Sequence, residues 1–272
     1  MDLGLSQRVA LVTGASSGLG LAIARALAAE GCAVAMVARR KDVLEREARD
    51  IVAESKGRAL PLVADVTRPD DVVHVTSQAA ALLGPIDILV ANAGGPPSTT
   101  FTTTTDEQLQ SALELNLLAS IRLARAVVPG MRERRWGRVI FVSSMAAKQP
   151  LGGLLLSNTA RAGLLGFAKT IASECAPDNV LVNTVLPGHF DTDRTVGPPR
   201  GIRFRSRISR ERARELHHWS RVADRRRPDR RADLISQRLQ ASIAPGGMSP
   251  FRPIGMRTAG SHPQLHLNAD KE

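Results

Sequence analysis

The sequence predicts an α/β protein built as a single domain around a doubly wound parallel sheet. Three observations lead to this prediction. Six short apolar runs alternate with stretches whose apolar residues recur at helical spacing. The first run leads directly into a glycine-rich turn, and 272 residues suffice to bury an α/β core without disulfides or metal. Parallel strands joined by right-handed helical crossovers fit this order of elements.

The first third of the chain alternates strand and helix without long interruptions. Residues 8–13 are rich in β-branched side chains, which is typical of a buried parallel strand. The helix predicted for residues 18–30 carries Leu19, Ile23 and Leu27 at a spacing of four, and Gly31 ends it. The same alternation predicts further strands at 33–38, 58–63 and 86–91 and helices at 42–55 and 70–83.

The middle of the chain contains the longest predicted helices. Residues 106–132 form one helical stretch, and its apolar residues are expected to face the core: Leu109, Leu113, Leu117, Ile121 and Leu123. A helix is also predicted for 154–175, and the last two strands for 138–142 and 180–185. We therefore expect a nucleotide-binding body over residues 1–195 and an atypical tail over residues 196–272.

The charge is distributed unevenly between these two parts. Residues 1–195 carry 20 Lys and Arg against 19 Asp and Glu, whereas residues 196–272 carry 17 against 7, so +10 of the net +11 belongs to the tail. A basic segment can bind nucleic acid, but a solvated charged segment explains the same composition and is favoured. A third alternative is that the tail is read from a shifted reading frame.

Cysteine usage and hydropathy indicate the compartment. Cys32 and Cys175 are isolated, so neither a disulfide framework nor a metal site is expected, and a reducing compartment fits. No apolar run reaches the length of a membrane helix, and the first residues lack signal-peptide features. We expect a cytoplasmic protein that does not enter membranes.

A glycine-rich turn follows the first strand. The segment Thr13 to Gly20 reads TGASSGLG, and glycines at this place let the backbone and the following helix N-terminus approach a pyrophosphate. A tight packing turn is the alternative. The residues predicted to contact a dinucleotide here are Gly14, Ser16, Ser17, Gly18, Leu19 and Gly20.

The TGxxxGxG spacing and the motifs that follow it resemble the short-chain dehydrogenase/reductase family over residues 6–195. Asp65-Val66 ends the third predicted strand, where the family contacts the adenine, and Asn92-Ala93-Gly94 ends the fourth, beside the cofactor. Pro187-Gly188 followed by Thr192 matches a PGxxxT motif that the family uses beside the nicotinamide. The resemblance implies a Rossmann-type fold and is nearest to the 3-oxoacyl-carrier-protein reductase branch.

The same resemblance implies catalytic positions. Asn116 lies at the family's helix-borne catalytic asparagine, and Ser144 matches the catalytic serine. Thirteen residues after that serine the family places a YxxxK motif, but this chain has Ser157 and Arg161 there. The whole chain contains no tyrosine, so no displaced phenol can donate the proton. Arg161 stays charged and cannot relay a proton, although it can still hold the nicotinamide ribose.

The end of the second predicted strand indicates which cofactor binds. An acidic residue there would accept a hydrogen bond from the ribose 2′-hydroxyl, whereas this chain has Ala38-Arg39-Arg40-Lys41. Arginine donors suit a phosphate, so we expect NADP(H) in preference to NAD(H), with Arg39 on the 2′-phosphate and Arg40 in reserve. A solvated basic turn is the alternative.

Three functions remain open at this point. The first is an oxidoreductase that acts on a small carbonyl or alcohol by an altered mechanism, in which Ser144, Asn116, Arg161 or a bound water polarises the carbonyl. The second is an NADP(H)-binding regulatory or interaction protein with little turnover, and the third is different chemistry in the same pocket. Family members commonly assemble through their long helices, so we expect a homodimer through residues 106–132 and 154–175.

Overall fold

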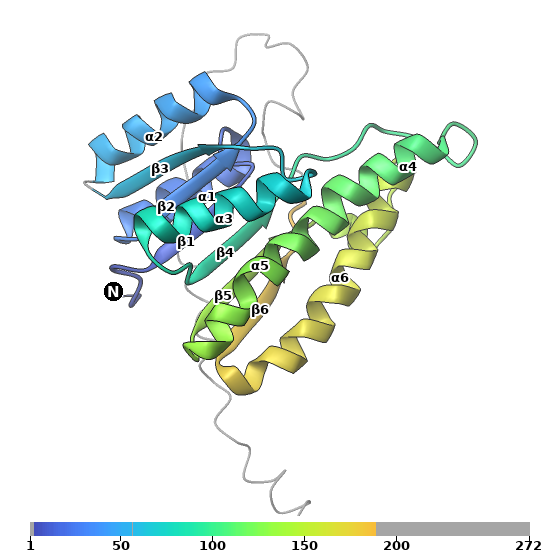
Figure 1. Cartoon of the computed structure of the whole chain (residues 1–272). Helices are drawn as coiled ribbons and strands as arrows, with labels where there is room; N and C mark the ends of the chain where they lie inside the picture. Colours follow the sequence, from blue (N-terminus) through green and yellow to red (C-terminus); the bar gives the residue numbers. More distant parts are fainter. Residues whose placement is uncertain (1–2, 56, 189–272) are drawn as a thin grey trace, which may run out of the picture. The chain divides into compact units, whose positions relative to one another are not determined.

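One parallel sheet forms the centre of the fold. The structure is a computed structural model, and it describes residues 3–55 and 57–188. The six strands lie in the order β3-β2-β1-β4-β5-β6, and every neighbouring pair is parallel (Figure 1). Their bounds are β1 Val9–Thr13, β2 Ala33–Ala38, β3 Arg58–Val63, β4 Ile88–Asn92, β5 Gly137–Val142 and β6 Val180–Val185. This order is the doubly wound arrangement that the sequence predicts.

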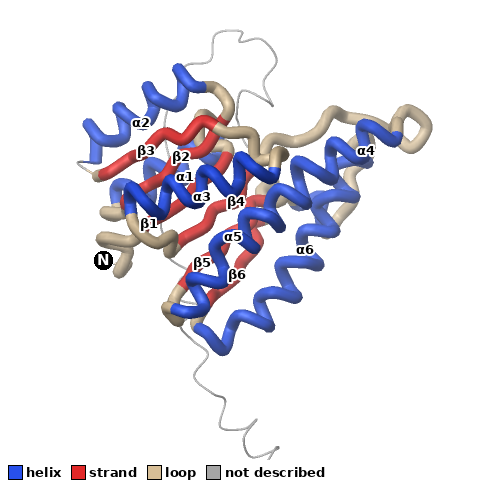
Figure 2. Tube along the Cα trace, in the orientation of Figure 1, coloured by secondary structure: helices blue, strands red, loops and turns tan. Residues whose placement is uncertain are grey.

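Helices cover both faces of the sheet. α1 (Gly18–Ala29) and α2 (Lys41–Ser55) pack on one face, where their buried side chains join the even-numbered residues of β1. α3 (Pro69–Leu83), α5 (Ala119–Glu133) and α6 (Leu155–Cys175) cover the other face, with α5 in contact with both neighbours (Figure 2). α4 (Asp106–Leu113) leads into α5.

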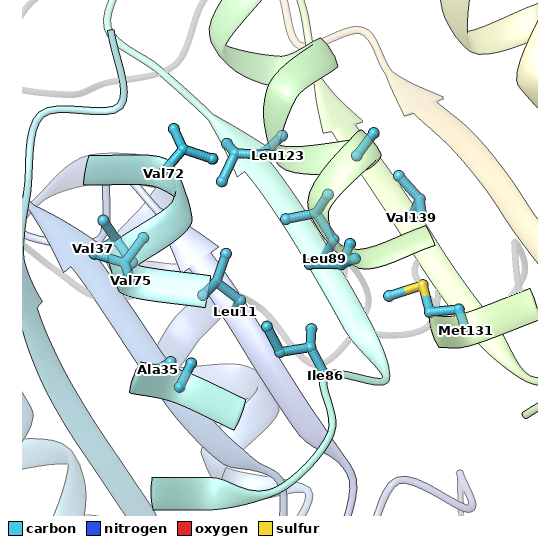
Figure 3. Close-up of a cluster of buried hydrophobic side chains, with 14 of the residues drawn as sticks. Leu11, Ala35, Val37, Val72, Val75, Ile86, Leu89, Leu123, Met131 and Val139 are labelled. Carbon is cyan, nitrogen blue, oxygen red and sulfur yellow. The ribbon is translucent and has the colours of Figure 1, made fainter. Parts of the chain in front are cut away.

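The core consists of two apolar layers separated by the sheet. Figure 3 shows the layer on the α3 and α5 side, where Leu11 and Leu89 of the central strands lie under Val75 of α3 and Leu123 of α5. All five residues of β1 are buried, as expected for the interior of a parallel sheet. The segments predicted to contact the cofactor follow the carboxyl ends of β1, β3 and β4, so this edge of the sheet positions the candidate site.

The buried face of α1 is made of smaller residues than expected. Leu19, Ile23 and Leu27 are only half-buried at the margin of the core, whereas Ala24 and Ala28 are fully buried against the sheet. Alanines on this face let the helix axis approach the strands closely. The N-terminus of α1 is therefore held tightly against the end of β1.

The helical stretch predicted for residues 106–132 is interrupted. A π turn over Glu114–Leu118 separates α4 from α5, and the Ala119 N–H donates to the Glu114 carbonyl five residues earlier. Glu114 also forms an ion pair with Arg122 across the turn. The interruption inserts one extra residue into the helix and reorients the side chains around Asn116.

β4 begins two residues later than predicted. Asp87 stands just before it, where its carboxylate accepts a hydrogen bond from the Val9 N–H at 3.2 Å and its own N–H donates to the Val9 carbonyl at 2.9 Å. The Asp87 backbone thus contacts β1 before the regular β4 ladder starts at Ala10 and Ile88.

The predicted tail (196–272) and the predicted contact residue Thr192 lie outside the described residues.

Candidate active site

The glycine-rich loop lies at the point where the strand order reverses, between the carboxyl ends of β1 and β4. Gly14 has φ +61°, a left-handed conformation that favours glycine. At Gly20 a Cβ would lie 2.3 Å from the Gly14 carbonyl oxygen and 2.7 Å from Asn92 Nδ2. Glycine is therefore required for α1, the loop and Asn92 to approach one another this closely.

Asn92 joins the ends of the two central strands. The Thr13 hydroxyl donates to the Asn92 carbonyl at 2.8 Å and accepts from the Asn92 N–H at 2.9 Å, while Asn92 Nδ2 donates to the Thr13 carbonyl at 3.2 Å. Ala93 and Gly94 continue from this junction, and nothing lies within 4 Å of a Cβ at Gly94. The two predicted glycine motifs are thus brought together, with open space beside the second.

The N-terminus of α1 fits a phosphate. Its N-cap residue Ser17 is extended and makes no side-chain capping hydrogen bond, so the first N–H groups of the helix keep their capacity to donate to an anion. The predicted phosphate-contacting residues Gly14, Ser16, Ser17, Gly18, Leu19 and Gly20 all belong to this loop and first turn. The residues present therefore fit a dinucleotide pyrophosphate.

The two arginines after β2 take different positions. Arg40 Nη2 donates to Ser17 Oγ at 3.0 Å and to Ser16 Oγ at 3.3 Å, which places the guanidinium over the glycine-rich loop. The Arg39 side chain is 75 % exposed and lies 3.8 Å from Asp65. Of the pair, Arg40 is the one that the structure brings to the loop.

Asp65 and Val66 follow β3 on the same edge of the sheet. Burial alone would raise the pKa of Asp65, but hydrogen bonds from the Thr67 N–H at 3.0 Å and hydroxyl at 2.8 Å, together with the charges of Arg39 and Arg68, lower it. Val66 packs against the core. Asp65 is thus held as a carboxylate near the end of β2.

Ser157 and Arg161 meet at the carboxyl end of β5. Arg161 is 7 % exposed; its Nε donates to Ser157 Oγ at 3.2 Å and its Nη1 to the Val142 carbonyl at 3.2 Å. A guanidinium is thereby placed inside the fold, between α6 and the strand that leads to Ser144.

Ser144 lies two residues after Val142, whose carbonyl accepts the hydrogen bond from Arg161. Its hydroxyl accepts a hydrogen bond from the Ala146 N–H at 3.2 Å and caps a short 3₁₀ turn. The Met145 N–H donates to the Pro187 carbonyl at 3.1 Å, so Pro187 and Gly188 lie beside the residue that follows Ser144. The predicted serine and the described part of the PGxxxT segment thus share one edge of the site.

Asn116 occupies the centre of the π turn and is 2 % exposed. The neighbouring Leu117 packs on α6, since a Cβ at Gly163 would lie 3.2 Å from Leu117 Cδ2. π turns of this kind are frequent at functional sites. The turn therefore brings Asn116 to the helix that carries Ser157 and Arg161.

Two residues that sequence reasoning missed shape the approach to Ser157. Asn158 donates through Nδ2 to the Leu151 carbonyl at 2.9 Å and accepts from the Leu151 N–H at 3.3 Å, which closes the loop before α6. The Thr99 N–H donates to the Gly153 carbonyl at 3.0 Å, and its carbonyl accepts from the Leu155 N–H at 3.3 Å. The threonine run at 99–105 was a visible signal of an unusual loop, whereas Asn158 offered none.

Comparisons with known proteins agree with this geometry. A family model described as short chain dehydrogenase matches residues 8–198. The 3-oxoacyl-[acyl-carrier-protein] reductase FabG of Escherichia coli is 37% identical over 188 residues, which cover 69% of this chain and 75% of that protein. Human dehydrogenase/reductase SDR family member 4 is 37% identical over 192 residues, covering 69% of this chain and 68% of that protein.

Solved structures show the same likeness. L-sorbose reductase from Gluconobacter frateurii, complexed with NADPH and L-sorbose, superposes with a TM-score of 0.69 at 41% identity and covers 71% of this chain and 74% of its own. An NAD+-bound xylitol dehydrogenase superposes with a TM-score of 0.65 at 28% identity, covering 68% of this chain and 71% of its own. With its glycine-rich loop, strand order and matched residues, this chain belongs to the short-chain dehydrogenase family of NAD(P)-dependent oxidoreductases, which act on carbonyl and hydroxyl groups.

Proposed function

We propose that this protein is an NADP(H)-dependent oxidoreductase that interconverts a small carbonyl compound and its alcohol through a non-standard active site. Ser144, Asn116, Ser157 and Arg161 would form that site. The observation that carries the proposal is the buried Arg161 guanidinium, which is fixed by Ser157 and by the end of β5. Arg161 carries a permanent positive charge beside the Ser157 hydroxyl, at the carboxyl end of β5.

The proposed chemistry divides between cofactor and protein. The nicotinamide, when bound, supplies or accepts the hydride. Ser157 Oγ accepts a hydrogen bond from Arg161, so its own O–H remains able to donate to a substrate oxygen. The same holds for Ser144, whose oxygen accepts from Ala146. The charge of Arg161 would stabilise negative charge that develops on the substrate oxygen, and the protein would thus act without a phenol.

The proposed preference for NADP(H) rests on Arg40. Its guanidinium is held over Ser16 and Ser17, beside the N-terminus of α1. The 2′-phosphate of NADP(H) would accept charge-assisted hydrogen bonds from it there. We therefore give Arg40 the main part on the 2′-phosphate and Arg39 the secondary one. Asp65, Val66, Asn92, Ala93 and Gly94 would line the adenine and nicotinamide halves, with Pro187, Gly188 and Thr192 beside the nicotinamide.

A second candidate is an NADP(H)-binding protein with little turnover. It is favoured by the absence of tyrosine from the whole chain. General acid–base assistance contributes roughly 10²- to 10⁴-fold to rates, so its loss would slow the reaction while leaving cofactor binding in place. In that case regulation or interaction, rather than catalysis, would be the role of the site.

One experiment separates the two candidates. NADPH and NADH are titrated by fluorescence, and NADPH oxidation is then followed with β-ketoacyl thioesters, ketoses and simple ketones, the classes suggested by the relatives. Tighter binding of NADPH with turnover of at least one class supports the oxidoreductase. Binding without turnover supports the second candidate, and absence of binding contradicts both.

We also propose a homodimer in the cytoplasm, assembled through α4, α5 and α6. Leu118 is exposed on the π turn between α4 and α5, which gives that surface an apolar contact point. Sedimentation velocity tests the dimer.

Cys32 and Cys175 are free and buried, in keeping with the proposed reducing compartment. None of the helices within residues 3–55 and 57–188 has the length and apolar character to cross a membrane.

The domain division stays a proposal as well. A body of residues 1–195 and a basic tail of residues 196–272 follow from the charge distribution, and the tail is outside the described residues. Nucleic-acid binding by the tail remains the less favoured function. Retention on double-stranded DNA that falls steeply with salt would be the result in its favour.

A further inference from the structure

One arginine of α5 contacts two segments of the candidate site that are far apart in the sequence. Arg122 donates from Nη2 to one carboxylate oxygen of Glu114 at 3.2 Å and from Nη1 to the other. Its Nη1 also donates to the Thr67 carbonyl at 3.4 Å. Glu114 begins the π turn that carries Asn116, and Thr67 lies in the loop between β3 and α3, two residues after Asp65. A single guanidinium therefore joins the π turn to this loop.

The ion pair between Arg122 and Glu114 depends on the π turn. Ion pairs within an α-helix join residues three or four apart, because residues eight apart lie about 12 Å from each other along the axis. Glu114 and Arg122 are eight apart, yet two hydrogen bonds join them. The turn between them holds one residue more than an α turn, which reduces the separation that their side chains must bridge. The pair therefore favours the π turn over regular helix.

The loop that contains Thr67 is itself fixed by hydrogen bonds. The Thr67 N–H and hydroxyl both donate to the Asp65 carboxylate, at 3.0 Å and 2.8 Å. The Asp65 N–H donates to Asp71 Oδ2 of α3 at 2.8 Å. The Thr67 carbonyl faces α5, where Arg122 binds it. A shift of Asp65 toward a bound adenine would therefore move the acceptor of Arg122.

We propose that Arg122 is a positioning residue that couples the loop after β3 to the π turn. A cofactor whose adenosine half fixes this loop would hold the Thr67 carbonyl against Arg122. Arg122 would then hold Glu114, and with it the π turn that places Asn116. The inference rests on the proposed function, which assigns Asn116 to catalysis and Asp65 to the adenosine half. Such a coupling is reciprocal, so the π turn also favours cofactor binding.

The first test does not require turnover. Adenosine 2′,5′-bisphosphate, which corresponds to the adenosine half of NADP(H), is added to saturation, and hydrogen exchange at residues 114–119 is followed by mass spectrometry. In the unaltered protein this probe should slow the exchange about threefold to tenfold, a modest coupling because the Arg122 and Glu114 side chains are each 29% exposed. In Arg122→Gln, saturation with the probe should leave the exchange unchanged. Equal slowing in both proteins would overturn the coupling.

Two further variants sharpen this test. Glu114→Gln removes the carboxylate from the other end of the ion pair, so it should abolish the effect of the probe as well. Arg125→Gln removes an exposed arginine from the same helix and should retain the full effect. Loss of the effect in the Arg125 variant would show that helix charge, rather than the contacts of Arg122, is responsible. If calorimetry shows that the unaltered protein does not bind the probe, the proposed cofactor site fails and the coupling with it.

The second test asks whether Arg122 acts through Asn116. At saturating NADPH with a turned-over ketone, Arg122→Gln should lower kcat about threefold to tenfold and leave KM for the ketone nearly unchanged. The same change in an Asn116→Ala background should lower kcat no further, because the two residues act as a unit. An unchanged kcat, or losses that add in the double variant, would overturn the positioning role. If the unaltered protein turns over no substrate, the proposed function fails, while hydrogen exchange still decides the coupling.

Discussion

At the scale of single residues, Arg40 and Arg39 offer a direct test of cofactor choice. We expect Arg40→Ala to weaken NADPH binding about 10- to 100-fold, because one or two charge-assisted hydrogen bonds are lost, and to leave NADH binding nearly unchanged. Arg39→Ala is the matched control, since Arg39 is largely exposed and lies 3.8 Å from Asp65. Fluorescence titration measures both. A larger effect of the Arg39 variant would reverse the assignment.

Ser157 and Arg161 form a second pair for substitution. The double variant Ser157→Tyr with Arg161→Lys should raise turnover roughly 10²- to 10⁴-fold, because it supplies a phenol and an ammonium at the positions that the family resemblance indicates. Ser157→Tyr alone should gain less, since the guanidinium it meets cannot relay a proton. The measurement is kcat at saturating NADPH. A double variant no faster than the unaltered protein would show that the altered site is already adapted to its reaction.

The sequence predicts residue identities at the site better than residue positions. The spacing from Ser144 to Ser157 locates the altered pair without any coordinates. The sequence analysis favoured Arg39 over Arg40 for the 2′-phosphate, whereas the structure brings Arg40 to the glycine-rich loop, because the two residues are adjacent and the sequence does not give the direction of their side chains. The double hydrogen bond of Asn158 to Leu151 was also out of reach, since it depends on how the loop closes.

At the scale of elements, two glycines in α6 differ in their surroundings. Nothing lies within 4 Å of a Cβ at Gly166, whereas one at Gly163 would lie 3.2 Å from Leu117. Gly166→Ala should therefore stabilise the protein by about 0.5–1 kcal/mol, because alanine favours the helix, and raise the melting temperature. Gly163→Ala should gain less or lose stability.

Thermal denaturation at several protein concentrations checks this prediction. A Gly166→Ala variant that melts higher than the unaltered protein at each concentration agrees with an open surface at that residue. A variant that melts lower than the unaltered protein would contradict the prediction and would indicate that the proposed dimer packs a second copy against Gly166.

Element bounds were predictable where the hydrophobic pattern alone determines them. The ranges 33–38, 58–63 and 180–185 coincide with β2, β3 and β6. β4 was misplaced because Asp87, a polar residue inside the apolar run, contacts β1 before the ladder begins. The π turn was missed because Leu109, Leu113, Leu117 and Ile121 recur at intervals of four, a spacing that also fits an uninterrupted α-helix.

At the scale of the whole molecule, acid sensitivity follows from carboxylates held in their charged form. Burial would raise the pKa of Asp65 and of Glu47, but hydrogen bonds lower both, from Thr67 for Asp65 and from Arg25 and Arg46 for Glu47. A lowered folded-state pKa contributes stability above the unfolded value of about 4, and this is lost as the pH falls through the folded pKa.

We therefore expect the melting temperature to fall as the pH drops below about 4. Thr67→Val removes the hydroxyl that donates to Asp65 at 2.8 Å, so the folded-state pKa of Asp65 moves back toward its unfolded value and the loss of stability in acid should be smaller than in the unaltered protein. Calorimetry across this range is the measurement. An acid decline identical in both proteins would show that Asp65 does not contribute to it.

The two thiols should report on global unfolding. Burial raises the pKa of Cys32 to about 11 and also raises the pKa of Cys175, and both side chains are almost fully buried. Since the thiolate is the reactive form, neither should react quickly with iodoacetamide at pH 8 in the native protein, and both should react after denaturation. Mass spectrometry of the labelled chain gives the result. Fast labelling of either cysteine under native conditions would indicate local opening.

The π turn also determines which changes in chain length the protein can tolerate. Each residue of an α-helix advances the chain by about 100° around the helix axis. Deleting a single residue between Glu114 and Leu118 would convert the turn to regular α-helix and rotate all of α4 by that angle relative to α5. Ala112, now buried, would turn away from its neighbours, and Asn116 would leave α6. The number of residues between α4 and α5 therefore cannot change by even one, although the side chains in this segment can vary.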